Sequence, residues 1–435
     1  MKTIKRFLSL LLSALLALPA PAFPAFDPVN DDTDLFLANP SITAQRPNVL
    51  LVLDNTANWN IPFTNEKNAI VQVVSGLDDG LFNVGLMMMV EAGSPNDSVD
   101  GGYVRFAVRQ MTGAAKTNLT SMVQNLNILN DKGNNNTVGY ALHEAYLYYA
   151  GLSSRSSGGK FKTDHDATTD ALLAGLPNHA LPGTSGPPAM PVLNSAYRSP
   201  IVDGCQKNFV IYISNGQANE NAAARAEVEG FLATLTGQNP PAVIGYGAGV
   251  PTGQQANWGD EMAKYLANAD ISASQTGVQH VYTYVVEVNP QSSGLGPDMT
   301  ALMKSVASNG KGGYFGVTSG ASGTAIVDAL NTIFNEIQAV NSVFAATTLP
   351  VSVNVQGTNV NQVYVGVFRP DANKAPRWLG NLKMYNFAVD TNSKVFLADA
   401  SNGIPPAVGN AAVDNVSTGF IKDTALSFWT QTSTF

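Results

Sequence analysis

Short, continuous apolar runs alternate along the chain with segments in which apolar residues recur every three or four positions. Continuous apolar runs are typical of strands buried on both faces of a parallel sheet. Such strands are expected at 48–53, 83–90, 208–213 and 281–288. An alternating strand is expected at 103–108 and a short one at 313–317. Helices are expected at 65–77, 138–149, 222–235, 260–267, 298–308 and 324–340. Strands that alternate with helices predict an α/β fold with a doubly wound, mostly parallel sheet.

Two segments depart from this alternation. Residues 151–204 hold clusters of Gly, Ser and Pro, and we expect an inserted, weakly held loop that is the first target of a protease. After about residue 347 apolar and polar residues alternate strictly, at 351–355 and 363–368, before a short strand near 394–397. Strict alternation predicts a smaller antiparallel β-rich module.

The N-terminus has the three parts of a secretory signal peptide: basic residues up to Arg6, an apolar stretch at 7–18, and the cleavage pattern Ala20-Pro21-Ala22. The alternative is an uncleaved anchor, but the apolar stretch is short for a stable membrane span. The predicted organisation is a signal peptide at 1–22, a lead-in at 23–46, an α/β domain at 47–342 with its insertion at 151–204, and a β-rich module at 343–435. An exported protein with no stable membrane span is therefore expected.

Composition narrows the classes of function. Charged residues are 13% of the 435 residues, about half the usual share, and the net charge is −8. With no basic stripe, nucleic-acid binding is not expected. The single cysteine, Cys205, excludes an intramolecular disulfide, and four histidines exclude most His-rich metal sites.

Candidate chemistry gathers at the carboxyl ends of the predicted strands, where a doubly wound sheet places its ligands. The first strand continues into Asp54, Thr56 and Asn58, and the strand at 208–213 continues into Asn215. Thr137 opens the helix that precedes the insertion. Oxygen ligands of this kind suit Mg²⁺ or Ca²⁺. The alternative is a hydrogen-bonded turn in which Asp54 caps backbone amides.

These residues resemble the metal-ion-dependent adhesion site of von Willebrand factor A domains, over roughly residues 47–342. More specifically, the chain resembles the PilY family of type IV pilus tip and biogenesis proteins. The segments that carry this second resemblance are Asp32-Thr-Asp-Leu-Phe-Leu-Ala-Asn-Pro40, the run from Cys205 to Gly216, Phe368-Arg-Pro-Asp371, and Arg377-Trp-Leu-Gly-Asn-Leu-Lys383.

The chain departs from the family pattern in ways that weaken the expected site. The family motif reads Asp-x-Ser-x-Ser, then Thr, then Asp on a later strand. Here the first part is Asp54-x-Thr56-x-Asn58, the later Asp is Asn215, and Thr137 lies one residue from the aligned Thr position. Only Asp54 carries a charge, so Mg²⁺ or Ca²⁺ is expected to bind weakly. Long family members also continue into a calcium-binding β-propeller, for which this chain has no Asp-x-Asp-x-Asp-Gly loop.

Other residues offer little chemistry. We expect His143, which lies beside Glu144 on its helix, to be at the surface or half-buried. Asp164, His165 and Asp166 could hold a metal only with a fourth partner. The sequence contains no G-x-S-x-G nucleophile motif, P-loop or dinucleotide-binding glycine motif, so an enzyme is not expected.

The resemblance implies an exported, non-enzymatic component of the type IV pilus system of a Gram-negative bacterium. It would act in the periplasm, at the outer cell surface or at the pilus tip, with minor pilins or a surface ligand as partners. The alternative is a stand-alone secreted adhesin with no pilus role.

Overall fold

A computed structural model gives the fold of the chain. The residues that the structure describes are 46–56, 61–91, 102–134, 138–155, 160, 162–166, 187–192, 195–204, 206–218, 222–288, 296–318, 323–341, 344–346, 363–369, 379–389, 395–401, 411–413, 421 and 425–428. The signal-peptide pattern, Cys205 and the strand expected at 351–355 lie outside them.

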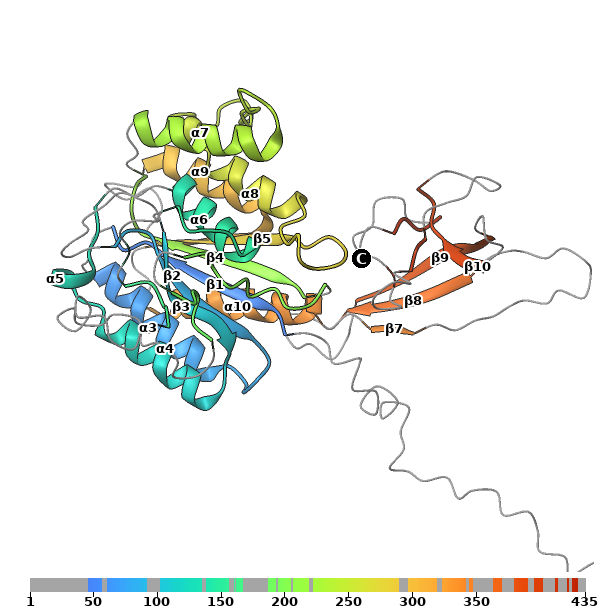
Figure 1. The fold of residues 1–435 in the computed structure, drawn as a ribbon, viewed down its shortest axis with the longest axis horizontal. Helices are drawn as coiled ribbons and strands as arrows, with labels where there is room; N and C mark the ends of the chain where they lie inside the picture. The colour runs from blue at the N-terminus through green and yellow to red at the C-terminus, as the bar shows by residue number, and fades with distance from the viewer. Residues whose placement is uncertain are drawn as a thin grey trace, which may run out of the picture. The chain divides into compact units, whose positions relative to one another are not determined.

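A six-stranded sheet forms the centre of the α/β body (Figure 1). Its strands in spatial order are β3 (Tyr103–Gln110), β2 (Asn83–Met88), β1 (Asn48–Leu53), β4 (Asn208–Ser214), β5 (Val281–Val288) and β6 (Lys311–Val317). All neighbours are parallel except β2 and β3. The predicted doubly wound, mostly parallel sheet is confirmed. The strand order reverses between β1 and β4, as the candidate site requires.

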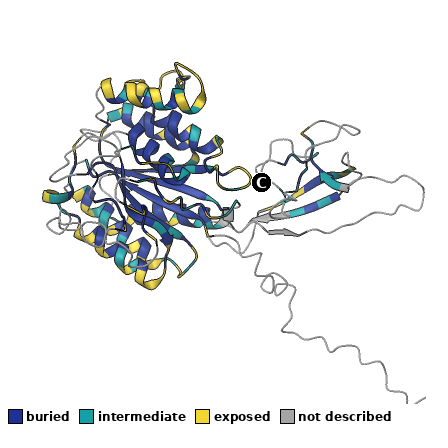
Figure 2. Ribbon diagram, in the orientation of Figure 1, coloured by how far each residue is buried: buried dark blue, intermediate teal, exposed yellow. Residues whose placement is uncertain are grey.

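Helices cover both faces of this sheet, as Figure 1 shows. One face carries α6 (Val138–Ala150), α7 (Ala222–Thr236), α8 (Gly259–Asn268) and α9 (Gly296–Asn309); the other carries α3 (Ile61–Gly76), α4 (Gly113–Asn125) and α10 (Thr324–Asn341). Short helical turns lie at α5 (Ile128–Asp131) and at Gln255–Asn257. Figure 2 shows the sheet buried between two layers of helices whose outer faces are exposed.

The sequence pattern missed α4. Polar residues dilute its apolar stripe, although Ala115, Leu119 and Met122 lie on its buried side. Its start is set by Thr112, whose side chain accepts a hydrogen bond from the backbone amide of Ala115 at 3.3 Å. A capping threonine of this kind satisfies an amide that the first helical turn leaves open.

A separate antiparallel sheet follows in the C-terminal part of the chain. Its spatial order is β10 (Val395–Ala398), β9 (Leu379–Val389), β8 (Val363–Arg369) and β7 (Phe344–Ala346). The expected antiparallel module is confirmed, with β9 as a long strand that the sequence pattern did not predict. Across the described residues, no helix combines the length and apolar character needed to cross a membrane.

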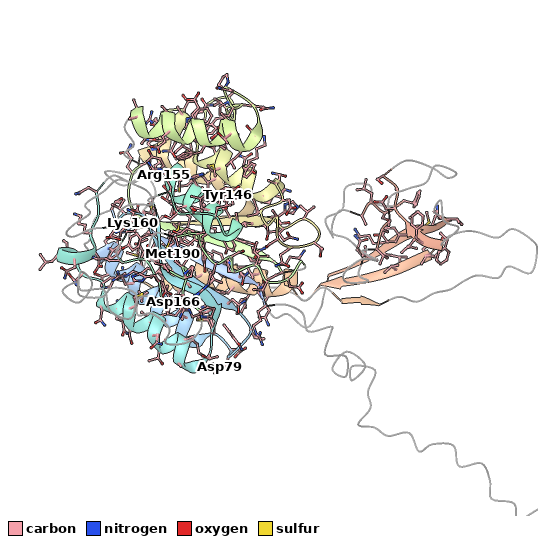
Figure 3. The ribbon with its side chains drawn as sticks, in the orientation of Figure 1. Asp79, Tyr146, Arg155, Lys160, Asp166 and Met190 are labelled. Carbon is pink, nitrogen blue, oxygen red and sulfur yellow. The ribbon has the colours of Figure 1, made fainter. Side chains whose placement is uncertain are left out.

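Several described residues of the insertion are packed, which differs from a weakly held loop, whereas Leu152, Val192 and Val202 are exposed. The expectation that a protease cuts the insertion first stays a prediction. Lys160, Lys162 and Asp164 are each only 1% exposed, and Met190 belongs to the core on the α6 side of the sheet. Figure 3 labels Lys160, Asp166 and Met190 against the α/β body. Asp164 joins the sheet directly, because its backbone amide donates to the carbonyl of Val104 at 2.9 Å.

Candidate functional site

Asp54 lies directly after β1 and is fully buried. Its Oδ1 accepts hydrogen bonds from the backbone amide of Thr56 at 2.9 Å and from the Thr56 hydroxyl at 2.7 Å. Its Oδ2 accepts one from the hydroxyl of Ser214, the last residue of β4, at 2.6 Å. The carboxylate therefore joins the carboxyl ends of the two strands between which the sheet order reverses.

Asn215, the residue after β4, turns its amide toward α3. Its Nδ2 donates to Oε1 of Glu66 at 2.9 Å, and both side chains are buried. Burial raises the pKa of the Glu66 carboxyl well above its ordinary value; the hydrogen bond from Asn215 opposes this shift, and the nearby charge of Asp54 adds to it. The site therefore contains a second carboxyl group that the sequence analysis missed.

The helical pattern contained a signal for Glu66. The apolar side of α3 includes Phe63, Ile70 and Val73, and Glu66 lies three residues after the first and four before the second. Residues at these spacings share one face of a helix. An acidic residue on the buried face of the helix that follows Asp54 was therefore visible in the sequence.

The structure thus brings together Asp54, Thr56 and Asn215 of the five predicted metal-binding residues. Asn58 and Thr137 lie outside the described residues. Ser214 and Glu66 lie beside the predicted residues. Metal binding by the five predicted residues stays a prediction.

Asn55 fixes the loop beside Asp54. Its Nδ2 donates to the carbonyl oxygens of Val90 and Asp131 at 2.6 and 2.7 Å, and its Oδ1 accepts from the amides of Met89 and Val90 at 3.1 and 3.0 Å. Every polar atom of this buried amide is used. One side chain therefore connects the turn after β1 to the loop after β2 and to the last residue of α5.

A buried ionic cluster lies on the far side of Asn55. The carboxylate of Asp131 lies 3.5 Å from the guanidinium of Arg105 and 3.4 Å from the ammonium of Lys162, and all three side chains are almost completely buried. Burial lowers the pKa of Lys162, against the attraction of Asp131. The backbone amide of Lys162 also donates to Glu91 at 3.0 Å, so the insertion is fixed beside the candidate site.

The side chains around Asp54 fit a hard divalent cation chemically. They offer two carboxyl groups, the hydroxyls of Thr56 and Ser214, and the amide oxygen of Asn215, and hard cations prefer such oxygen ligands. Within the part of the chain that the structure describes, Oε2 of Glu66 and Oδ1 of Asn215 are buried without a hydrogen-bond partner. The described residues contain no group of three or more His, Cys, Asp or Glu side chains placed to hold a metal. Any ion here would thus depend on neutral oxygens for part of its coordination.

One further expectation is corrected, because His143 is buried, at 6% exposed, rather than at the surface or half-buried. Its neighbour Glu144 is fully buried. Glu144 accepts hydrogen bonds from the hydroxyls of Ser154 and Tyr197 at 2.6 and 2.5 Å, so it attaches α6 to the insertion. Burial raises its pKa and lowers that of His143 to about 4.

The acidic residues of the Asp164-His165-Asp166 segment are engaged by arginines. Asp164 pairs with Arg109, and Asp166 pairs with Arg198 at 2.6 Å. Burial raises the pKa of Asp164, against the opposing effect of Arg109. The segment thus has a structural explanation that needs no metal.

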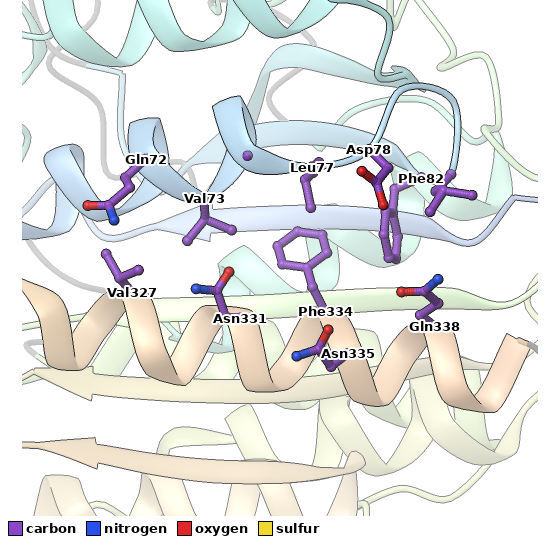
Figure 4. Close-up of a pocket in the computed structure, with 12 residues that line it drawn as sticks. Gln72, Val73, Leu77, Asp78, Phe82, Val327, Asn331, Phe334, Asn335 and Gln338 are labelled. Atoms are coloured by element: carbon purple, nitrogen blue, oxygen red, sulfur yellow. The ribbon is translucent and has the colours of Figure 1, made fainter. Parts of the chain in front are cut away.

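A pocket of about 370 Å³ lies between α3 and α10 (Figure 4). Its lining includes Leu77, Asp78 and Phe82, which lie at the end of α3 and just before β2. These residues mark the amino ends of the strands, whereas Asp54 follows the carboxyl end of β1. The pocket is therefore separate from the candidate site.

Comparisons with known proteins were made at the level of sequence and of structure. No protein-family model matches the sequence, and a search of the curated proteins finds no match. Solved structures that the chain resembles include von Willebrand factor A domains and pilus-associated proteins.

Three of these structures illustrate the sequence identity, TM-score and coverage of the matches. The von Willebrand factor A domain of SpRpn10 is 10% identical, with a TM-score of 0.29, over 66% of this chain and 95% of that one. The pilus adhesin SpaC from Lactobacillus rhamnosus GG is 10% identical, with a TM-score of 0.37, over 81% of this chain and 36% of that one. Proximal thread matrix protein 1 from the mussel byssus is 11% identical, with a TM-score of 0.31, over 70% of this chain and 50% of that one.

Proposed function

We propose that this chain is an exported, non-enzymatic binding protein whose α/β domain engages a protein or surface ligand through a weakly held Mg²⁺ or Ca²⁺. The observation that carries the proposal is the position of Asp54, which bridges Thr56 and Ser214 where the strand order reverses. Ligands of doubly wound sheets bind at this place. The site is then a degenerate metal-ion-dependent adhesion site.

In this proposal the chain's own groups prepare the site. The Asp54 carboxylate orients the hydroxyls of Thr56 and Ser214, whose oxygens can still act as ligands while their O–H groups donate hydrogen bonds to Asp54. Asn55 keeps the surrounding loops fixed, so little reordering is needed when an ion arrives. A bound ion would supply an open coordination position for an acidic group of the partner.

The biological setting that we propose is the type IV pilus system of a Gram-negative bacterium. The protein would act at the pilus tip or in pilus assembly, with minor pilins as partners, in the periplasm or at the outer cell surface. The support is the order of the sequence segments that resemble the PilY family, behind a signal-peptide pattern. The alternative is a stand-alone secreted adhesin, which the absence of pilin genes beside the coding sequence would favour.

Calorimetric titration of the purified protein with Mg²⁺ and with Ca²⁺ tests the ion. Binding is expected in the wild-type protein and should be lost in Asp54→Ala. Heat signals that are the same for both proteins would contradict the site.

Fractionation of the native bacterium tests the setting. Co-sedimentation of the protein with sheared pili, lost in a strain without minor pilins, is expected. Secretion that is independent of pili would contradict the pilus role and favour the stand-alone adhesin.

A further inference from the structure

Glu66 is a buried acid with one oxygen in use and one unused. Its Oε1 accepts a hydrogen bond from Asn215, while its Oε2 is buried and has no hydrogen-bond partner among the described residues. The side chain is fully buried. An unsatisfied buried oxygen costs stability. Asp164, Asp260 and Glu261 also have one, so the hydrogen bond to Asn215 at the end of β4 is what distinguishes Glu66.

Asn215 shows the same imbalance. Its Nδ2 donates a hydrogen bond to Glu66, but its Oδ1 is buried and accepts none from the described residues. Asn215 directly follows Ser214, which donates to the carboxylate of Asp54, so the two unsatisfied oxygens belong to the same strand end as Asp54. Two buried oxygens without donors, close to a buried carboxylate, favour a positively charged occupant.

Glu66 also lies where it can replace the acid that the family-like motif has at position 215. That motif has an Asp where this chain has Asn215, which removes one negative charge from the end of β4. Glu66 returns one carboxyl group from α3, and the Asn215 amide connects it to the strand end. Two carboxyl groups, of Asp54 and Glu66, therefore lie near the site, one after a strand and one on a helix.

We propose that Glu66 supplies the second carboxylate ligand of the cation at Asp54, in place of the acid absent at position 215. The inference rests on the cation binding proposed above and adds a residue that the motif does not contain. A second carboxylate raises affinity through its charge, since the affinity of oxygen sites follows the number of charged ligands.

The decisive experiment compares three variants with the wild-type protein by calorimetric titration with Mg²⁺ and Ca²⁺ at one fixed pH. Glu66→Gln keeps the shape and an acceptor for Asn215 but removes the charge, and affinity should fall by about tenfold or more. Adding Asn215→Asp to Glu66→Gln returns the acid to the strand, and affinity should recover. Glu144→Gln, which changes an equally buried acid on α6, should leave affinity unchanged.

Thermal melts in chelator and in excess ion give a second readout that also checks folding. Glu66→Gln should melt at or above the wild-type temperature in chelator, because it removes a buried ionisable group, and should lose the stabilisation by ion. Wild-type affinity in Glu66→Gln, or no recovery in the double variant, would overturn the role of Glu66. Wild-type affinity in Glu66→Gln would still be compatible with ion binding at Asp54. The biological setting is tested separately, by co-sedimentation with pili.

Discussion

The hydroxyl of Ser214 donates a 2.6 Å hydrogen bond to the carboxylate of Asp54, and both side chains are completely buried. The bond connects the end of β4 to the end of β1. Ser214 also accepts a hydrogen bond from the amide of Gly216 at 3.1 Å, so its hydroxyl organises the turn after β4. The Ser214 hydroxyl therefore fixes two parts of the candidate site, because it donates to Asp54 and accepts from the amide of Gly216.

Replacing this hydroxyl should destabilise the domain without an ion. Ser214→Ala removes a donor from a buried carboxylate, and we expect a loss of about 1–3 kcal/mol in the free energy of unfolding. Urea denaturation in chelator measures it. Ser195→Ala, which removes a half-buried hydroxyl from an exposed hydrogen bond to the carbonyl of Val192, should cost less stability than Ser214→Ala. Equal losses in the two variants would contradict the special position of Ser214.

The ionic cluster beside Asn55 should be far more sensitive than an ion pair at the surface. Asp131→Ala leaves Arg105 and Lys162 buried without their carboxylate, and a loss of about 3–5 kcal/mol is expected. The comparison is Asp166→Ala, whose partner Arg198 is partly exposed and whose loss should be below about 1 kcal/mol. Chemical denaturation of both variants makes the test. A small effect at Asp131 would mean that the cluster is open to water.

The contact between Glu144 and the insertion should contribute to stability. Tyr197→Phe removes a hydroxyl that donates to the buried carboxylate at 2.5 Å, and we expect a loss of about 1–3 kcal/mol. The matched change is Tyr140→Phe, which removes a donor from the partly exposed Glu227, an acid that keeps its pairing with Arg155. Its effect should be smaller, as judged by thermal melts. The opposite order would show that the insertion is held elsewhere.

A pH dependence should come from Glu261, which is buried beside Asp260 on α8. Burial and the charge of Asp260 raise the pKa of Glu261 to about 8, although the amide of Ile244 donates to it at 2.8 Å. The hydroxyls of Tyr246 and Ser305 lie near Asp260. In the unfolded chain the same carboxyl ionises near its ordinary pKa of about 4.3. Between these values the folded state binds more protons, so stability should fall as pH rises.

Unfolding free energies measured from pH 5 to 9 give the test. Glu261→Gln should reduce the slope by up to about 1.4 kcal/mol per pH unit below pH 8 and leave it unchanged above. Other buried acids with raised pKa values, such as Glu144 and Glu287, add slopes of the same sign in both proteins. The difference between variant and wild type therefore isolates Glu261. Parallel curves would show that this carboxyl is ionised throughout.

The sheet could be predicted from the sequence because its strands are buried on both faces. Runs such as 48–53 and 208–213 are apolar at almost every position, and no other packing suits them as well. The meeting of Asp54 and Asn215 followed from the strand order of such sheets. By contrast, α4 was missed because much of its surface is polar, and Glu66 because acidic residues in helices are usually solvated.

The long separation of the two strand ends along the chain has a kinetic consequence. Asp54 and Ser214 are 160 positions apart, so their contact requires a large loop to close, and such contacts make folding slow. An ion that needs both strand ends would gain its affinity only after β1 and β4 have paired. If the transition state for folding precedes this pairing, the ion would slow unfolding while refolding kept its rate. In a chevron plot, added Mg²⁺ would then lower the unfolding arm alone.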